Sequence, residues 1–590
     1  METIDRYPVL LTPPGAYRPT LMARSHMVSS GHYLATAAAF RILERGGNAV
    51  DAGVAAGLAL NVVHSDMTSL GGVAPIIIYL SGRREVWTIS GIGWWSEEAT
   101  LERVLPRIRG DQSGIAHAVA PAAAAAWITA LERFGTLSFA EVAAPAIELC
   151  EEGFPLFQYF QDTLRTRLQR ILASPSSAEV YLPGGQVPAV GTLLVQRDHG
   201  RTLRRLAEAE ASARDNGREA GLRAAREYFY QGPIAEAMVQ FCQSVGGFLT
   251  LRDLAEFRVD VEPSVAVLYR GYQVHACGPW CQGPVVLQAL KILEGYDMHS
   301  FGHNSAEHLH LLTEALKAAF ADRHAYYGDP RVVSVPLSGL LSDVYAVEWR
   351  KRIRLHQAAP TMPEPGNPWS FATEQRQGST LPPYPPEAIS DRMLGSNDTS
   401  YVCVVDAEGN GFSATPSDGL SDSPVVPGLG IRISTRGIQS YHHPDHPNSI
   451  APRKRPRLTP NPGLVLQDGR LWMLYGTPGG DVQPQAMTQL LLNVIDFRMD
   501  LQAAVEAARV ASYSFPQSDY PHACFPGELR AESRIPLPVL ARLSDLRHRM
   551  YIWPELVPAA GGLCAIQIDP QAQTRRGGAD PRRLSYVFGW

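Results

Sequence analysis

Three stretches of the 590-residue chain concentrate side chains that could do chemistry. His442-His443-Pro444-Asp445-His446 is rich in metal-ligand types, but its turn-like setting favours a solvated loop over a metal site. Cys277 and Cys281 lack the second pair that a structural zinc site needs. The basic run at 453–457 favours a solvated loop over a contact with a carboxylate substrate or nucleic acid. The sequence therefore predicts no metal site and no cofactor.

Motifs of several large enzyme classes are missing. The chain has no Gly-x-x-x-x-Gly-Lys-Ser/Thr phosphate loop, no Gly-x-Gly-x-x-Gly at a strand-to-helix turn, no His-Glu-x-x-His and no Gly-x-Ser-x-Gly. Nucleotide-binding, zinc-protease and serine-hydrolase classes recognised by these motifs are therefore excluded.

One threonine stands where the chain changes character. Thr399 follows an irregular, Pro-rich stretch at 357–398 and precedes an apolar run that predicts a strand. A β-branched residue favours strands for steric reasons, so Thr399 fits an ordinary strand start. It also fits a catalytic hydroxyl, and the local pattern leaves both interpretations open.

Hydrophobic periodicity predicts the elements that position these residues. Two helices are expected within 33–63, separated at Gly46-Gly47-Asn48, and a strand pair at 73–80 and 85–89. Further helical patterns lie at 122–134, 139–152, 201–229, 233–243 and 305–327. Further strand patterns lie at 265–274, 401–405, 411–415, 464–466 and 471–475.

The composition is that of a soluble globular protein. Apolar residues make up 45% and charged residues 19%, and the net charge of −5 carries no electrostatic footprint for nucleic acid. Seven Cys are unlike a secreted disulfide framework, so most are expected to be free thiols. The N-terminus has no visible export signal, and the uncharged stretch at 112–131 predicts a buried helix. We expect a cytoplasmic protein that binds neither nucleic acid nor membrane.

Six short blocks, spread in order over several hundred residues, carry a family resemblance. They are Gly46-Gly47-Asn48-Ala49-Val50-Asp51-Ala52, Ser69-Leu70-Gly71-Gly72, Pro145-Ala146-Ile147-Glu148-Leu149, the segments 246–254 and 314–323, and Gly476-Thr477-Pro478-Gly479-Gly480. Together they resemble the γ-glutamyltranspeptidase family of N-terminal-nucleophile hydrolases. The resemblance implies an α+β fold, a four-layer αββα sandwich of two antiparallel sheets between helical layers.

The resemblance also implies a proenzyme that cuts itself between Asp398 and Thr399. Residues 1–398 would form a large subunit and residues 399–590 a small one, and the two would assemble as a heterodimer or as a homodimer of heterodimers. The irregular stretch at 357–398 would then be a tether whose end leaves the active site. The substrate is expected to be a small amide.

Catalytic roles follow from the same resemblance. Thr399 would be the nucleophile, with its own α-amine as the base. Ser417 would orient it, and the backbone N–H groups of Gly479 and Gly480 would hold the oxyanion.

The sequence departs from the family at its substrate anchors. Trp94 and Trp95 stand in the block in which the family has its Arg. The family's acidic pair falls approximately at Gly437-Ile438-Gln439, and its Ser-Ser pair falls at Leu458-Thr459. A bidentate Arg contact to a carboxylate is not replaced by Trp. The combination resembles the family's divergent amidase branch, which includes oxamate amidohydrolase and cephalosporin acylase-like members.

Substrate-binding candidates therefore need other residues. Trp94 and Trp95 would line an apolar acyl pocket or pack in the core. Arg432 and Arg436 would bind an acidic substrate or lie at the surface, and Asp418 and Thr459 complete the set.

Two rival functions stay open. One is γ-glutamyl transfer or glutathione hydrolysis with different anchors. The other is an uncleaved, catalytically silent binding protein with the same fold, because Tyr401 stands where the family commonly has His, and Asp418-Gly419 where it has Asn nearby.

Overall fold

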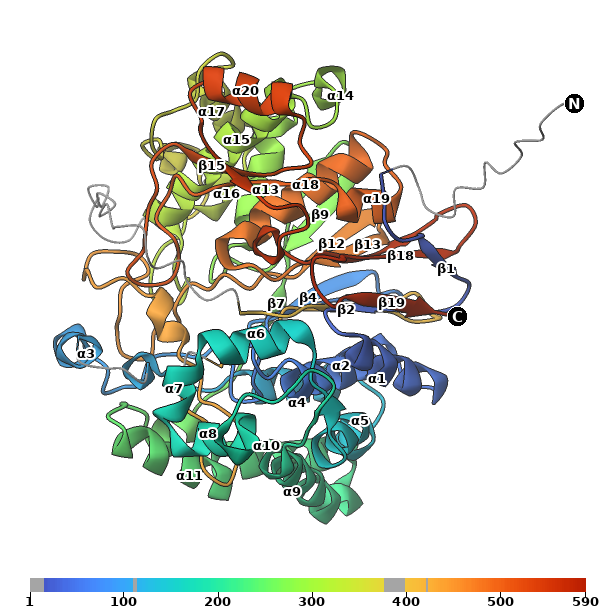
Figure 1. Cartoon of the computed structure of the whole chain (residues 1–590), viewed down its shortest axis with the longest axis vertical. Coiled ribbons are helices and arrows are strands. Elements are labelled where there is room, and N and C mark those ends of the chain that lie inside the picture. Colours follow the sequence, from blue (N-terminus) through green and yellow to red (C-terminus); the bar gives the residue numbers. More distant parts are fainter. Residues whose placement is uncertain (1–14, 110–113, 376–397, 421–422) are drawn as a thin grey trace, which may run out of the picture.

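Two antiparallel sheets face each other between two layers of helices (Figure 1). The structure, a computed structural model, describes residues 15–109, 114–375, 398–420 and 423–590. This arrangement confirms the predicted α+β sandwich of four layers.

Each sheet has seven strands, and each contains strands from both sides of the junction between residues 398 and 399. The first sheet runs, in order, β1 (Leu21–Ala23), β18 (Arg575–Ala579), β17 (Cys564–Ile568), β13 (Arg470–Gly476), β12 (Gly463–Gln467), β9 (Tyr272–Ala276) and β8 (Val265–Tyr269). The second runs β19 (Tyr586–Gly589), β2 (Met27–Ser30), β10 (Val402–Val405), β11 (Gly411–Ala414), β3 (Ile76–Leu80), β4 (Glu85–Ile89) and β7 (Val261–Pro263). A cut between Asp398 and Thr399 would therefore leave two fragments that share both sheets.

Apolar side chains that alternate along the strands fill the space between the sheets. Met27, Ile77, Val405, Leu474 and Ile566 are among those buried there. This inter-sheet core is continuous across the two would-be fragments, so hydrophobic burial would hold them together.

Helices cover the outer face of each sheet. On the second sheet lie α1 (Tyr33–Glu44) and α2 (Ala49–Val63), and the further helices of this layer are α4 (Ala123–Phe134), α5 (Phe139–Glu151), α9 (Arg197–Ala213), α10 (Arg218–Tyr230) and α11 (Pro233–Ser244). On the first sheet lie α13 (Gly283–Leu293), α18 (Gln483–Ile495) and α19 (Leu501–Glu506), and the further helices of this layer are α15 (Ala306–Tyr326), α17 (Asp343–Arg352) and α20 (Leu537–Asp545). A small sheet of β14 (Val510–Ser512), β15 (Glu528–Glu532) and β16 (Arg549–Trp553) joins the latter group.

The predicted elements are confirmed, with three corrections. Of the uncharged stretch at 112–131, expected to be one helix, the α-helix begins only at Ala123, after a short turn at 115–117, because the residue before Pro121 is disfavoured in the helical conformation. The helical pattern at 201–229 is two helices, because Gly217 adopts a φ of 101° between α9 and α10. The strand pattern at 265–274 is a hairpin, β8 and β9, because Arg270 and Gly271 form its turn with φ of 50° and 88°. Residues 376–397 of the expected tether lie outside the described residues.

The two expected solvated loops differ in burial. At 442–446 the expectation holds for most of the loop, since Pro444 and Asp445 are exposed and only His446 is buried, stacked on Tyr441 with 3.7 Å between ring centroids. The basic run at 453–457, in contrast, is largely buried. Arg455 is buried and pairs with Asp329 at 2.8 Å. A buried charge with a paired carboxylate does not need water, which the local sequence could not reveal.

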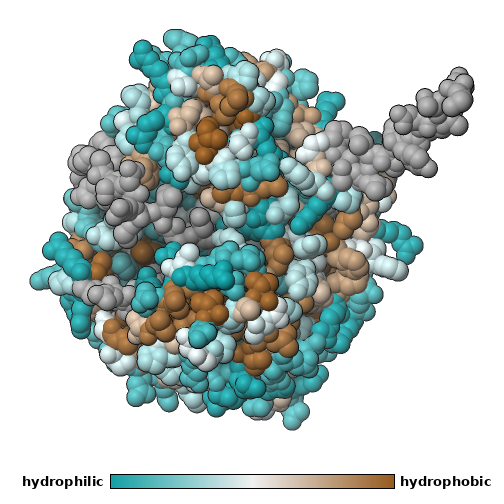
Figure 2. Space-filling model, in the orientation of Figure 1, coloured by the Kyte–Doolittle hydropathy of each residue, from teal (hydrophilic) through white to brown (hydrophobic). Residues whose placement is uncertain are grey.

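The surface in Figure 2 is mostly hydrophilic, with apolar residues in separate patches. All seven Cys are buried and free of disulfides, as expected. None of the helices in the described ranges combines the length and the apolarity that a membrane crossing requires.

Candidate active site

Thr399 lies directly before β10 and faces Ser417, which follows β11. The two strands pair in antiparallel register with Val402 opposite Ala414. Continuing this register places residue 399 opposite residue 417, and the two side-chain oxygens are 2.7 Å apart. Either hydroxyl can donate this hydrogen bond, so Ser417 holds the Thr399 side chain in one orientation.

The backbone at Thr399 is strained. Its φ is 142°, a conformation that β-branched residues rarely adopt. Such strain persists only where the surroundings impose it, and it clusters at functional sites. Here the side chain is 1% exposed, and the Ser400 N–H donates to the Pro416 carbonyl at 2.9 Å. The strain therefore lies next to the peptide bond between Asp398 and Thr399.

Arg436 links the residues around this bond. Its Nη2 donates to Ser417 Oγ at 2.6 Å and to the Asp398 carboxylate, and its Nε lies 3.4 Å from Asp418 Oδ1. Arg436 is buried, at 2% exposure, in the short turn 436–439. Of the two alternatives, the surface position is therefore wrong for Arg436, and its charge lies within the site.

Asp418 carries the second carboxylate of the site. Burial raises its pKa to about 6, the charge of Asp398 acts in the same direction, and Arg436 opposes both. The Asp418 carbonyl accepts a hydrogen bond from Arg432 at 2.9 Å. Arg432 also donates to the Tyr181 hydroxyl at 2.8 Å, so it is buried and supports the backbone of this loop.

Gly479 and Gly480 lie on the loop between β13 and α18. Their φ values are 125° and 56°. Within the described residues, neither backbone N–H donates to another protein atom. The last residue of β13, Gly476, packs so closely on the Tyr401 ring that an added Cβ would lie 2.2 Å from it. The strand that leads into this loop is thus held against the start of β10, and the two amides remain available to a ligand.

Gln439 and Gln282 join the remaining candidates to this loop. The Gln439 amide makes two hydrogen bonds with Thr459, at 2.9 and 3.1 Å, and donates to Asp519 at 2.7 Å. Gln282 donates to the carbonyls of Thr459 at 3.0 Å and Gly480 at 2.9 Å. Gln439 and Thr459, which stand where the resemblance expects the acidic and Ser-Ser anchors, are therefore in contact.

The two tryptophans have different surroundings. Trp95 is fully buried, donates to Ser440 Oγ at 2.9 Å and packs on Gly437, so it backs the turn that carries Arg436. Trp94 packs edge-on against Phe257, with 5.1 Å between ring centroids. Core packing is thus the observed environment of Trp95, and Trp94 contacts a separate group of residues.

A cavity of about 320 Å³ lies beside the Gln439 turn. Its lining includes Tyr441, His442, Tyr520 and Arg109. The Tyr520 N–H donates to the Ile438 carbonyl at 2.9 Å, which fixes this wall to the turn. The space is adjacent to Asp519, whose pKa is raised to about 6, chiefly by burial.

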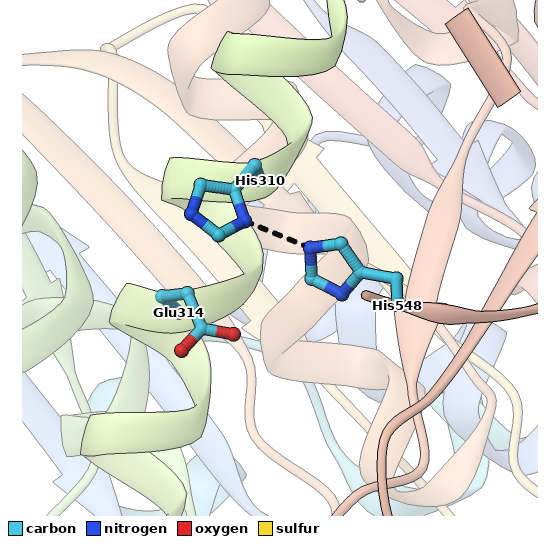
Figure 3. A group of neighbouring side chains, drawn as sticks. All are labelled: His310, Glu314 and His548. Carbon is cyan, nitrogen blue, oxygen red and sulfur yellow. Dashed lines mark hydrogen bonds between the residues drawn. The ribbon is translucent and has the colours of Figure 1, made fainter. Parts of the chain in front are cut away.

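A second cluster of chemically active side chains lies on α15, drawn in Figure 3. Ligand atoms of His310, Glu314 and His548 fall within 4.8 Å of one another. His310 donates from Nε2 to the Arg354 carbonyl and accepts at Nδ1 from His548, both at 2.8 Å. Glu314 accepts from Lys317 at 2.9 Å and from the Ala359 N–H at 3.1 Å. The cluster thus holds the chain at 354–359, where the predicted tether begins.

Sequence reasoning missed Gln282, Gln439 as a hydrogen-bonding residue, and Asp519. Gln282 precedes the N-terminus of α13, and Asp519 lies in the loop before β15. They come together only through the packing of both sheets, and no local motif signals such a contact.

Comparisons with known proteins identify the family of this chain. The family described as Gamma-glutamyltranspeptidase matches residues 35–590. The Glutathione hydrolase-like YwrD proenzyme of Bacillus subtilis is 31% identical over 570 residues, covering 95% of this chain and 98% of the relative. The Acylase ACY 1 proenzyme of a Pseudomonas species is 33% identical over 560 residues, covering 92% and 90%.

A solved structure shares the whole architecture. The crystal structure of cephalosporin acylase from Bacillus halodurans superposes with a TM-score of 0.83 at 28% identity, covering 100% of this chain and 99% of that one. The chain therefore belongs to the γ-glutamyltranspeptidase family, and it is an enzyme of the hydrolase and acyltransferase type.

Proposed function

We propose that this chain is a self-processing amidohydrolase with Thr399 as its nucleophile. The observation that carries the proposal is the 2.7 Å contact between Thr399 Oγ and Ser417 Oγ beside a strained backbone. Several relatives are proenzymes, which supports a chain that becomes active by cleavage.

The cleavage would use only groups of the chain and water. Thr399 Oγ attacks the Asp398 carbonyl carbon, the C–N bond breaks, and the acyl group moves from N to O. The hydroxyl proton passes to the released amine. Water then adds to the ester and releases the Asp398 carboxylate, which leaves residues 1–398 and 399–590 as two subunits. The strain at Thr399 favours this step because cleavage removes the restriction on its φ.

The new α-amine would serve as the base in turnover. An α-amine has a pKa of about 7.7–8.0 in the absence of perturbation, close to the pH at which a general base works best. It would take the Thr399 hydroxyl proton during attack on an amide carbonyl. The Gly479 and Gly480 amides would stabilise the oxyanion, and water would hydrolyse the acyl-enzyme.

One observation favours the γ-glutamyl rival. Asp519 accepts a hydrogen bond from Gln439, which stands where the resemblance expects the family's acidic pair, and the Asp519 carboxylate would be offered to a substrate amine. The amide of Gln439 and the hydroxyl of Thr459 are otherwise bonded to each other, so the usual anchors are replaced. We therefore keep hydrolysis of a small amide other than a γ-glutamyl one as the leading function.

The experiment is a denaturing gel of purified protein combined with an amide panel. Wild type should give two fragments and release p-nitroaniline from at least one acyl anilide. Thr399→Ala should stay full-length and inert. Two fragments in that variant would place the cut elsewhere, and a wild type that stays whole would support the silent binding protein.

A further inference from the structure

We propose that the Asp398 carboxylate occupies, in the uncut chain, the subsite that later binds a carboxylate on the substrate's acyl group. The inference rests on the proposed function and specifies its substrate class. The enzyme would hydrolyse amides of short dicarboxylic acids, with succinyl amides as the nearest match.

The Asp398 carboxylate sits in a built anion site. Its side chain is 4% exposed. Its Oδ2 accepts from Arg436 Nη2 and from the Gly419 N–H, the latter at 2.7 Å. A hydrogen bond from a guanidinium to a carboxylate is among the stronger polar contacts in proteins. The site therefore recognises a carboxylate through the charge of Arg436 and the backbone N–H of Gly419.

This carboxylate belongs to the acyl group that the nucleophile attacks. In the N-to-O shift, Thr399 Oγ becomes acylated by the Asp398 carbonyl carbon. The side-chain carboxylate is two carbons, Cα and Cβ, from that carbonyl. The resulting ester is an acyl-enzyme, so the chain's own first substrate is an aspartyl acyl group with its carboxylate on Arg436.

Gly419 shows that the acyl chain passes close to the backbone. A Cβ on Gly419 would lie 2.7 Å from the Asp398 Cβ, closer than such atoms approach. A side chain at position 419 would therefore displace any acyl chain that follows the path of Asp398. The absence of a side chain fits a narrow channel between the attacked carbonyl and the anion site.

Cleavage changes the electrostatics of this subsite. When Asp398 leaves, Arg436 loses that carboxylate and keeps Asp418, 3.4 Å away, as an acidic neighbour. A buried guanidinium is stabilised by a new carboxylate in the same position. An uncharged acyl group of equal length offers no such partner.

The test compares two substrates on the mature wild-type enzyme. They are succinyl-p-nitroanilide and its methyl ester, which have the same acyl chain with and without the charge. We expect kcat/KM to be about 100-fold or more higher for the free acid, because a site built for a polar group rejects an analogue that lacks it. Equal values, or preference for the ester, would overturn the subsite.

Two variants separate recognition from general activity. Arg436→Gln should reduce the ratio of the two kcat/KM values to near one, and this ratio does not move if activity merely falls. Arg453→Gln is the matched control, because Arg453 pairs with Glu97 and Glu256 instead. Its ratio should equal that of wild type.

If Arg436→Gln does not cleave itself, the subsite can still be tested by inhibition of the wild-type enzyme. On wild type, succinate should inhibit competitively, at a concentration at least tenfold lower than monomethyl succinate. Equal inhibition would contradict the subsite. An uncut chain that hydrolyses neither anilide would instead contradict the proposed function.

Discussion

The molecule contains two buried polar clusters that differ in how completely their groups are bonded. In the α15 cluster, both ring nitrogens of His310 and both carboxylate oxygens of Glu314 have protein partners. At Thr399, the backbone is strained and the nearby Gly479 and Gly480 amides donate to no other atom of the described residues. The first cluster is richer in residue types that bind metals or transfer protons, yet its His310 and Glu314 form hydrogen bonds with the backbone of Arg354 and Ala359.

Residue type alone is therefore a poor guide to a functional site. The α15 cluster stabilises the chain at 354–359, whereas the Thr399 cluster keeps groups available for a reaction. If this division holds, changes near Thr399 should affect the reaction, and changes in the α15 cluster should affect stability.

The largest effect is expected from the Thr399 hydroxyl. Thr399→Val keeps the branched shape and removes only the oxygen, so it should abolish both cleavage and amide hydrolysis. Thr399→Ser keeps the hydroxyl and should still give two fragments. The measurement is a denaturing gel over several days, with anilide hydrolysis in parallel. Activity in the Val variant would remove Thr399 from the mechanism.

The next effect concerns the two amides. Ala cannot easily adopt the φ of 125° at Gly479, so Gly479→Ala should turn the Gly480 N–H away and slow turnover by about 10²-fold. Gly480→Ala should have a smaller effect, because a φ of 56° is accessible to Ala and its Cβ would meet no atom within 4 Å. Steady-state kcat values would reveal the order, and a larger loss at Gly480 would contradict this assignment.

A third change should affect stability instead of catalysis. His548→Ala removes the donor to His310 Nδ1, and a buried polar atom left without a partner costs about 1–3 kcal/mol. Thermal or denaturant unfolding should show this loss, while kcat/KM of the mature enzyme changes less than twofold. The exposed Leu537→Ala is the control for both measurements. A large drop in kcat/KM would give the α15 cluster a catalytic role.

The smallest effect is a pH dependence of that stability. Burial lowers the pKa of His548 to about 3, and His310 and Lys317 act in the same direction. Between the ordinary value of about 6.5 and about 3, the unfolded chain binds a proton that the folded chain does not. Stability is therefore retained above pH 6.5 and lost as the pH falls. The difference between wild type and His548→Ala should shrink on acidification, and a constant difference would exclude this titration.

Much of the fold could be predicted from the sequence. Periodicity located α1, α2, α15 and the β10–β11 hairpin, because burial on one face leaves a regular pattern. The short strands β1, β2 and β19 were missed, since three or four residues leave too little pattern. The break between α9 and α10 at Gly217 could be recognised only from the backbone conformation.

The site was less predictable. Thr399 stood out only through the family resemblance, and its contact with Ser417 follows from the hairpin register. The position of Arg436 inside the site depends on tertiary packing of the turn 436–439 against the segments that carry Asp398 and Ser417. The cytoplasmic location and the role of Trp94 remain predictions.

The intact mass and N-terminal sequence of freshly purified wild-type protein decide whether the chain cuts itself before Thr399. We expect two polypeptides, of residues 1–398 and 399–590, with the smaller one beginning Thr-Ser-Tyr. A single chain of the full 64.4 kDa after prolonged incubation would contradict it.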